Sequence, residues 1–216
     1  MATILSSFDV SSPEHKTSLK IDVVEGLDQE HIDYMAQQWR PIMDRQRDAA
    51  LREYALLPEP RDPDSWQKML EKYGIPDHHW DWERKCAMPV GANRSVYGLL
   101  NGDHLEAAML LAFDQTARLA PVGQPLIYVD YLAIAPWNRS PIQKPERFRR
   151  LGSLLLGAAV EISRVRNWDG RCGLHSIPSA ESFYQAKGMQ DLGADPSYED
   201  MHYFEFDATS ARTFTS

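Results

Sequence analysis

The fold is decided by VDYLAIAP (Val129–Pro136) and by RRLGS (Arg149–Ser153), which a polar loop separates. The first segment lies in an apolar run that ends at a proline, which predicts a central strand from Leu126 to Ala135. The second opens a stretch from about Arg149 to Arg166 in which apolar residues form one stripe, which predicts a helix. A strand is predicted after that helix, so we expect a mixed α/β fold with a strand–helix–strand crossover.

Further elements are predicted on both sides of this unit. Asn101-Gly102 joins two apolar runs, which is a strong signal for a β-hairpin. A short helix is predicted from Pro178 to Lys187, because Gly188 is a natural residue to follow a helix C-terminus. The other predicted strands are residues 19–23, 95–100, 105–113, 171–176 and 201–206.

The N-terminal part divides into an arm, a strand and an insert. Residues 1–18 are small, polar and unpatterned, so we expect a loose arm. Residues 19–216 are expected to form a single domain, because the length suits one enlarged domain better than two small ones. Residues 27–92 form an insert after the first strand. Helices are predicted there from Asp28 to about Leu57, with a break or kink at Pro41, and around residues 65–73.

The composition is that of a globular protein with a core, since 43% of the residues are apolar and 25% are charged. The net charge of −8 argues against a general affinity for nucleic acid or for an anionic membrane. Two cysteines cannot form a disulfide framework, and no signal sequence or long apolar run is visible. We therefore expect a soluble protein of a reducing compartment, the cytoplasm.

The start of the helix after the polar loop has the chemistry of an anion site. Backbone N–H groups at a helix N-terminus are unpaired and carry a partial positive charge. Gly152 would let a phosphate approach the backbone closely, and Arg147, Arg149 and Arg150 add positive charge. A pyrophosphate would fit there. A solvated helix end with no ligand is the alternative interpretation.

With their neighbours, these segments resemble the GNAT superfamily of acyl-CoA-dependent N-acetyltransferases. The resemblance rests on three motifs in order, Leu132–Pro136, Leu151–Leu155 and Ala180–Met189, and covers about Leu126 to Phe206. It implies a central, mostly antiparallel twisted sheet and an enlarged helical insert that covers the acceptor site. It also implies an enzyme that transfers an acetyl group from acetyl-CoA to a primary amine by direct attack in a ternary complex.

The resemblance implies that the loop and the helix start bind the pyrophosphate of acetyl-CoA through the signature Gln/Arg-x-x-Gly-x-Gly/Ala. Arg147 matches its first position and Gly152 its last, whereas Arg150 stands where the first glycine is expected. The strand backbone at Leu132 and Ile134 would pair with the pantetheine arm. The expected cofactor-binding residues are Leu132, Ala133, Ile134, Arg147, Arg149, Arg150, Leu151, Gly152 and Ser153.

Three catalytic candidates follow from the same resemblance. Tyr184 matches the tyrosine that protonates the departing CoA thiolate, and its alternative role is packing. Asp130 stands where some protein-acetylating members carry a base glutamate, and it would accept the amine proton through a bridging water. Its alternative role is to orient the substrate or to pair with an arginine. His175 could relay a proton or bind substrate, and its alternative role is to cap a strand.

Other polar and aromatic clusters allow two interpretations. His78, His79, Asp81 and Glu83 lack the geometry and the second ligand pair of a zinc site, so no metal is expected. Cys172 is expected to be a small core residue. Aromatic residues of the insert could surround a ring or an alkylamine, or could anchor the insert to the core. They are Trp39, Trp66, Trp80 and Trp82.

Two rival functions stay open. A CoA-binding regulatory module without catalysis is favoured by the replaced glycine. A toxin-type acetyltransferase acting on aminoacyl-tRNA would need a basic surface around the cleft, which makes nucleic acid an unexpected partner. The acceptor is a small-molecule or peptide amine that the sequence does not identify, no membrane partner is expected, and a homodimer is compatible with the resemblance.

Overall fold

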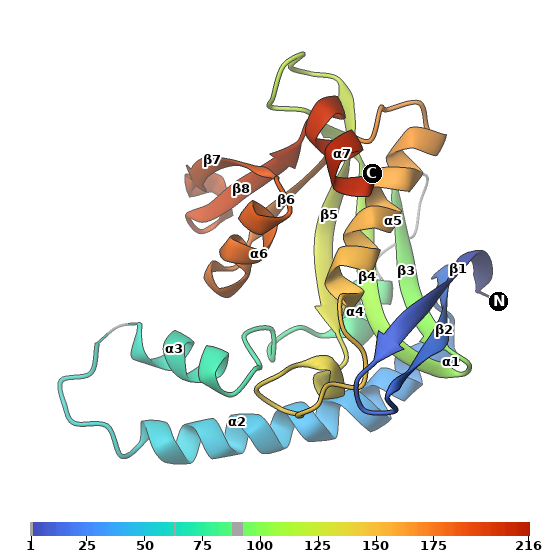
Figure 1. Ribbon diagram of the computed structural model, residues 1–216. Helices are drawn as coiled ribbons and strands as arrows, with labels where there is room; N and C mark the ends of the chain where they lie inside the picture. Colours follow the sequence, from blue (N-terminus) through green and yellow to red (C-terminus); the bar gives the residue numbers. More distant parts are fainter. Residues whose placement is uncertain (1, 63, 88–92) are drawn as a thin grey trace.

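The computed structural model describes residues 2–62, 64–87 and 93–216. One eight-stranded sheet runs through the molecule in the order β1-β2-β3-β4-β5-β6-β8-β7 (Figure 1). Adjacent strands are antiparallel except β5 and β6, which are parallel. The strands are β1 (Thr3–Ser12), β2 (Thr17–Glu25), β3 (Arg94–Asn101), β4 (His104–Thr116), β5 (Pro125–Ile134), β6 (Cys172–Ser176), β7 (Gln190–Asp195) and β8 (Met201–Phe206). The predicted mixed α/β fold with a mostly antiparallel sheet is confirmed.

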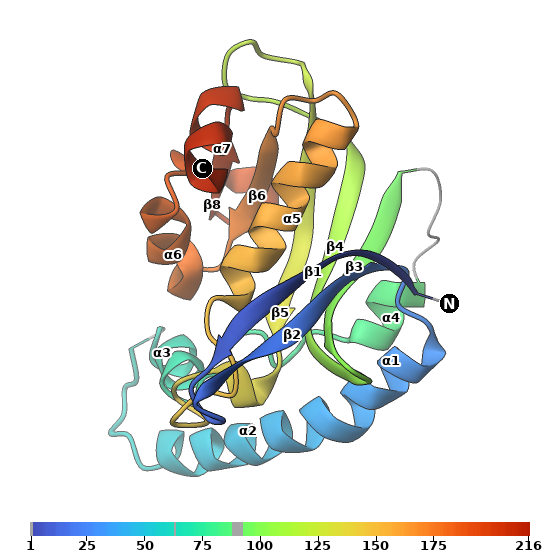
Figure 2. The ribbon, with the colours of Figure 1, turned by 45° about the vertical axis from the view of Figure 1, so that its right-hand side comes forward.

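Helices cover both faces of this sheet. The helices are α1 (Gln29–Tyr34), α2 (Arg40–Tyr54), α3 (Ser65–Lys72), α4 (Trp82–Ala87), α5 (Leu151–Val165), α6 (Glu181–Ala186) and α7 (Ala208–Thr215). On one face, α5 packs on Met109 and Leu111 of β4 in the main core. On the other, the insert packs on Ala108 of β4, because successive strand residues point to opposite faces, and on Leu105, which a β-bulge between it and Ala107 turns to the same side. The β1–β2 hairpin passes beside the N-terminal end of α5 (Figure 2).

The insert is helical, as predicted, although its predicted end at residues 88–92 lies outside the described residues. It begins where the Asp28 side chain accepts a hydrogen bond from the backbone N–H of His31. The expected break at Pro41 is absent. Instead, a π-helical turn (Met35–Trp39) joins α1 to α2 directly before this proline. Pro41 lies in the first turn of α2, where a proline is tolerated although it lacks the N–H group.

Outside the insert, three elements are not predicted from the sequence, namely β1, β7 and α7. Residues 3–12 are not a loose arm but strand β1, which pairs with β2 along its length. As an edge strand it is almost entirely exposed, so it lacks the apolar alternation that marks a half-buried strand. β7, at the opposite edge, also lacks an apolar alternation, because its partly buried residues are Asp191, Gly193 and Asp195. The mostly polar helix α7 depends on a capping box at Asp207.

Two boundaries also shift slightly. The hairpin predicted at Asn101-Gly102 is present, and its two-residue turn is Gly102-Asp103, because Asn101 still pairs with His104. The helix expected from about Arg149 begins at Leu151. Arg150 is the N-cap residue. Its backbone has a left-handed conformation, so it cannot belong to the right-handed helix that follows.

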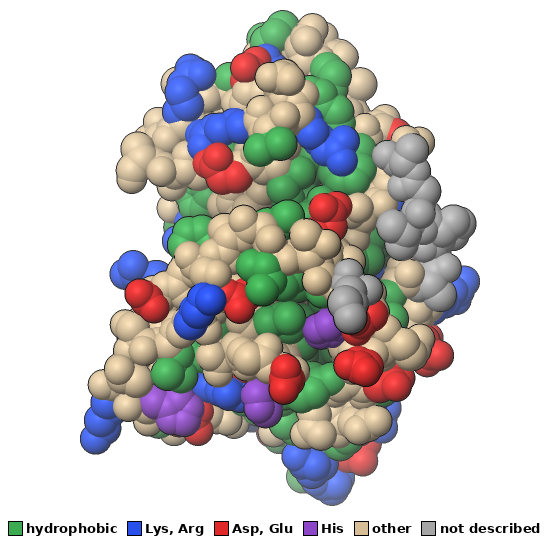
Figure 3. Space-filling model, turned by 90° about the vertical axis from the view of Figure 1, so that its right-hand side faces the viewer, with side chains coloured by type: hydrophobic (Ala, Val, Ile, Leu, Met, Phe, Trp, Pro, Cys, Tyr) green, Lys and Arg blue, Asp and Glu red, His purple; other side chains and the backbone are tan. Residues whose placement is uncertain are grey.

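The surface mixes charge with apolar groups. On the face shown in Figure 3, acidic and basic side chains lie among hydrophobic ones. The large exposed hydrophobic residues include Ile4, Leu5 and Phe8 of the edge strand β1. Among the helices formed by described residues, none has the length and apolar character needed to span a membrane.

Candidate active site

Strands β5 and β6 are paired only over a short segment. Their register joins Ile127 to Cys172 and Tyr128 to Gly173, and no described pair follows. From residue 129 onward, the backbone of β5 therefore lacks a strand partner on this side. Unpaired groups of a strand can pair with an extended ligand. One of them is occupied, because the Arg139 side chain donates to the carbonyl of Ile134 with Nε 2.9 Å away.

A β-bulge lies where the two strands separate. Leu111 of β4 is opposite Val129, but Leu110 is opposite Tyr131, so Asp130 is an extra residue in β5. Beyond the bulge, Leu132 packs against the core on the α5 side and Ala133 against the insert. The bulge therefore places Asp130 at the point where the edge of β5 opens.

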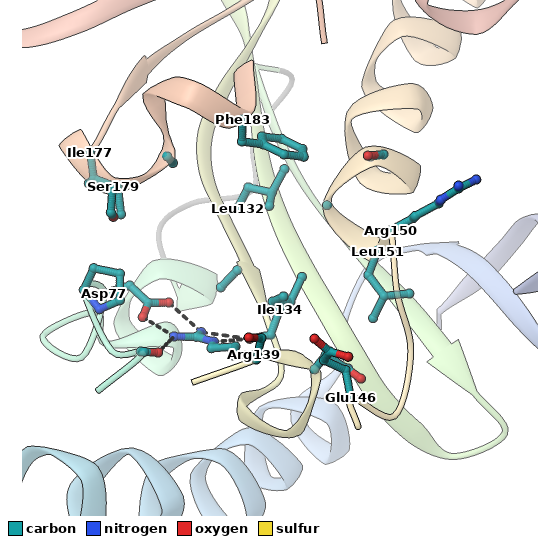
Figure 4. Close-up of a pocket in the computed structure, with 18 of the residues that line it drawn as sticks. Asp77, Leu132, Ile134, Arg139, Glu146, Arg150, Leu151, Ile177, Ser179 and Phe183 are labelled. Carbon is teal, nitrogen blue, oxygen red and sulfur yellow. Dashed lines mark hydrogen bonds and ion pairs between the residues drawn. The ribbon is translucent and has the colours of Figure 1, made fainter. Parts of the chain in front are cut away.

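A cavity of about 660 Å³ lies along this open edge (Figure 4). Its walls are the end of β5, the first turn of α5, residues 177–184 and part of the insert. Phe183 points toward Leu132 across it. The predicted site residues in its wall are Leu132, Ala133, Ile134, Arg149, Arg150, Leu151, Gly152, Ser153 and Tyr184. The structure thus brings most of the predicted site together, whereas Arg147, Asp130 and His175 do not line this cavity.

The first turn of α5 has the features of an anion site. No side chain of a described residue caps this end, so backbone N–H groups are available to a ligand. Arg150 takes φ 65° and ψ 14°, the left-handed conformation that glycine would adopt at this signature position. A Cβ added at Gly152 would lie 3.4 Å from Cζ of Phe183, so a larger side chain there would enter the cavity.

Arg147 corrects the sequence prediction, because its guanidinium is turned into the protein. Nη1 lies 3.1 Å from Oε1 of the fully buried Glu106, and Nη2 donates to Asn101 over 3.2 Å. Trp137 and Asn138 donate to Oε2 of the same carboxylate, over 2.6 and 2.8 Å. Burial raises the pKa of Glu106, while these donors and the arginine oppose that shift. A buried carboxylate needs a charged or hydrogen-bonding partner. Glu106 therefore pairs with Arg147, the arginine that was expected to contact the phosphate.

Two polar groups that sequence reasoning missed support the cavity. Glu106 is one, and its signal was a single carboxylate inside the apolar run of residues 105–113. The other is the pair of Asp77 and Arg139, joined by two hydrogen bonds of 2.5 and 2.8 Å (Figure 4). Arg139 also donates to the carbonyls of Gly74 and Ile134. This buried pair ties the insert to the end of β5.

Tyr184 lies on α6 and is buried, with 7% of its surface exposed. Its side chain reaches the cavity, and no other described residue forms a hydrogen bond with its hydroxyl. Burial raises the pKa of this phenol well above its usual range. The hydroxyl is therefore protonated at neutral pH and can donate to a ligand.

Asp130 is partly buried, with its Oδ2 atom 3.5 Å from Nη1 of Arg94. Burial raises the pKa of this carboxyl, and the cations of Arg94 and Lys85 oppose the shift. A carboxylate with a raised pKa is a stronger base, and the two cations favour its charged form. Asp130 thus has the chemistry of a proton acceptor beside the cavity.

His175 lies on the other face of β6 from Cys172, which is fully buried in the core as expected. Both of its ring nitrogens are engaged: Nδ1 is 2.7 Å from the Tyr128 hydroxyl and Nε2 is 3.0 Å from Asp195. Its ring stacks on Tyr198 at 3.8 Å. Burial lowers the pKa of His175 although Asp195 opposes this. The arrangement links β6 to the β7–β8 connection and leaves no ring nitrogen for a substrate.

Residues 78–83 contain the histidines and carboxylates that could suggest a metal. Within the described parts of the chain, no group of three or more His, Cys, Asp or Glu side chains is arranged to hold a metal ion. His78 instead contacts Trp66 and His79 edge to face. His78 thus packs within the insert, whereas His79, Asp81 and Glu83 are exposed.

In sequence comparisons, the chain matches no protein-family model and no curated protein. Solved structures do match its fold. FeeM, an N-acyl amino acid synthase from uncultured soil microbes, is 13% identical with a TM-score of 0.51, covering 90% of this chain and 94% of its own. A protein from Desulfovibrio desulfuricans assigned to the GNAT family of acetyltransferases is 10% identical with a TM-score of 0.50, covering 87% of this chain and 99% of its own. The strand order, the separated parallel strands and these neighbours together show that the chain has the GNAT acetyltransferase fold.

Proposed function

We propose that the protein is an acetyl-CoA-dependent N-acetyltransferase that acts on a primary amine of a small molecule or peptide by direct attack in a ternary complex. One observation carries the proposal: a single cavity extends from the first turn of α5, along the unpaired edge of β5, to the side chain of Tyr184. The end at α5 suits a pyrophosphate, and the end at Tyr184 suits a thioester. The edge of β5 between them suits the extended pantetheine arm.

In this proposal, the first turn of α5 binds the pyrophosphate of acetyl-CoA. The ligands are backbone N–H groups of residues 151–153, with Arg149 and Arg150 adding positive charge. Arg147 has no contact with the phosphates, and it holds the loop in place through Glu106. The pantetheine arm pairs with the open backbone edge at Leu132 and Ile134.

The proposed reaction needs two proton transfers, one from the acceptor amine and one to the departing thiolate. An ammonium has no lone pair, so Asp130 accepts its proton directly or through water. The neutral amine then attacks the thioester carbonyl, whose oxygen is stabilised by backbone N–H groups of β5. As the C–N bond forms and the C–S bond breaks, Tyr184 donates its proton to the departing thiolate.

The two rival functions predict different results. A regulatory module would bind acetyl-CoA without releasing a thiol. A toxin that acts on aminoacyl-tRNA would need a basic surface, but the cavity wall mixes Arg139, Arg149 and Arg150 with Asp77 and Glu146. That mixture favours a small or peptide acceptor. Cytoplasmic location, a homodimer and a single domain over residues 19–216 stay predictions.

The first experiment is calorimetric titration of the full chain with acetyl-CoA, with desulfo-CoA and free pyrophosphate as controls. We expect saturable binding of both CoA compounds and weaker binding of pyrophosphate. Thiol release is then measured with a panel of polyamines, amino acids and peptides. Binding without thiol release for any amine would favour the regulatory module, and absence of acetyl-CoA binding would overturn the proposal.

A further inference from the structure

Lys85 of α4 places its ammonium in an aromatic cage on the insert side of the sheet. Nζ lies 3.1 Å from the ring centroid of Tyr131 and 5.5 Å from that of Trp80. The two rings meet edge to face, with their centroids 5.0 Å apart. Aromatic faces attract a cation, and the attraction grows where water is excluded. The ligand class of this cage is therefore a primary alkylammonium, and in this structure the chain supplies one itself.

The cage shares one wall, Trp80, with the cavity of the proposed active site. Tyr131 follows Asp130 in the bulge and precedes Leu132, which lines the cavity. Trp80 belongs to the cage and to the cavity wall. The carboxylate of Asp130 is close enough to Lys85 for each charge to affect the titration of the other. The amine of Lys85 and the carboxylate of Asp130 thus lie near each other beside the open edge of β5, next to the cavity.

We propose that Lys85 is itself an acceptor, so that the protein acetylates this side chain in cis when acetyl-CoA is bound. The inference rests on the proposed function and adds a modification site to it. Burial lowers the pKa of Lys85, while Asp130 and Asp81 oppose the shift. Burial thus favours the neutral, nucleophilic form of the Lys85 amine, against the attraction of the two rings for its charged form.

The Lys85 ammonium gives one proton through a bridging water to Asp130, which passes it to solvent. The neutral Nζ attacks the carbonyl carbon of acetyl-CoA, a C–N bond forms, and the C–S bond breaks. Tyr184 protonates the thiolate, and the second proton lost by the nitrogen restores the tyrosine through solvent. The products are acetyl-Lys85, free CoA and one proton.

The test is to incubate the full chain with acetyl-CoA and no added amine, and to follow intact mass and peptide maps over time. We expect one acetyl group per chain on Lys85, at a rate independent of protein concentration. The matched control is Lys72, an exposed lysine paired with Glu53, which reports chemical acetylation. Lys85→Arg keeps a cation in the cage and should abolish the mass gain, whereas Lys72→Arg should preserve it.

Asp130→Asn should slow acetylation of Lys85 on the order of 10²-fold or more and leave Lys72 unchanged. Equal rates at both lysines, insensitive to Asp130→Asn, would show chemical acetylation and overturn the inference. Binding and turnover of acetyl-CoA with an external amine while Lys85 stays unmodified would overturn it too, leaving the proposed function intact. Failure of acetyl-CoA to bind would instead defeat the proposed function.

Discussion

Tyr184 and Asp130 have both lost most of the water around their ionisable groups, and in both burial raises the pKa. The consequences of the raised pKa differ, because at neutral pH the tyrosine is in its neutral form and the aspartate in its charged form. The phenol stays neutral and keeps a proton to donate. The carboxylate gains basicity, while Arg94 and Lys85 stabilise its charge. Two environments thus suit one residue to give a proton and the other to accept one.

Replacing Tyr184 with Phe should lower kcat for thiol release by about 10²–10⁴-fold and change the KM for acetyl-CoA little. The hydroxyl has no protein partner among the described residues, so its removal should also have little effect on folding. Steady-state kinetics and a thermal melt measure both. Tyr203→Phe is the control, since that buried hydroxyl donates to Glu205 and its loss should reduce stability instead. An equal loss of kcat and acetyl-CoA affinity in Tyr184→Phe would contradict the acid role.

Substitutions at Arg150 test whether the positive charge of its side chain offsets the strain of its left-handed backbone. A non-glycine residue with φ 65° is strained by about 1–2 kcal/mol. Arg150→Ala keeps the strain and loses the charge, whereas Arg150→Gly loses both. We expect Arg150→Gly to be more stable than Arg150→Ala by about 1 kcal/mol in urea unfolding, and both to bind acetyl-CoA more weakly than the wild type. Identical stabilities of the two variants would show that the left-handed conformation is absent in solution.

At the scale of elements, buried polar links hold the cavity walls together. Glu106 of β4 fixes the loop before α5 through Arg147 and Asn138. Arg139 fixes the insert through Asp77. Each link joins segments that a hydrophobic contact alone would leave free to slide, because hydrogen bonds to a charged group depend on direction.

The N-terminus of α5 should be sensitive to the size of residue 152. Gly152→Leu places a side chain against Phe183 inside the cavity, so acetyl-CoA affinity should fall at least tenfold. Gly157→Leu is the matched control on the same helix, where an added Cβ has no neighbour within 4 Å. Calorimetry and thermal melts compare the two. If both variants bind acetyl-CoA like the wild type, the cofactor does not occupy this cavity.

The β7–β8 connection should loosen in acid. Hydrogen bonds from Ser197, Arg118 and His175 hold the pKa of Asp195 well below its usual range. A lowered pKa in the folded state stabilises the protein above the unfolded pKa, and this stability is lost as pH falls toward the folded pKa. The melting temperature of Asp195→Asn should therefore lie below that of the wild type at neutral pH, and the gap should narrow toward about pH 3. A gap that is constant with pH would contradict this role.

For the whole molecule, the cavity joins parts distant in the chain: the insert, β5, α5 and the segment that leads into α6. A ligand bound there contacts all of them, so it stabilises the folded state as a unit. Acetyl-CoA at about 100 times its Kd should add about 2.7 kcal/mol. This corresponds to a rise in Tm of roughly 5–10 °C for a chain of this size. Differential scanning calorimetry with and without acetyl-CoA measures it, and an unchanged Tm at that concentration would count against the site.

The sequence by itself determined the elements whose pattern is local. The strand and helix of residues 126–166, the Asn101-Gly102 hairpin and the helical insert follow from periodicity and turn chemistry, which neighbouring residues carry. The motifs at Leu132–Pro136, Leu151–Leu155 and Ala180–Met189 also predict the observed fold and identify residues of β5, α5 and α6 that line the cavity.

Only the tertiary structure decided the rest, because it depends on partners far away in the chain. β1 and β7 are strands through their ladders with neighbours rather than through an apolar pattern. The family resemblance implies a phosphate as the partner of Arg147, but Arg147 instead pairs with the buried carboxylate of Glu106, 41 residues earlier, since an unpaired buried charge is too unfavourable to persist. His175 is likewise engaged by Tyr128 and Asp195. Local sequence specifies which side chains are available, and three-dimensional packing determines which partner each one meets.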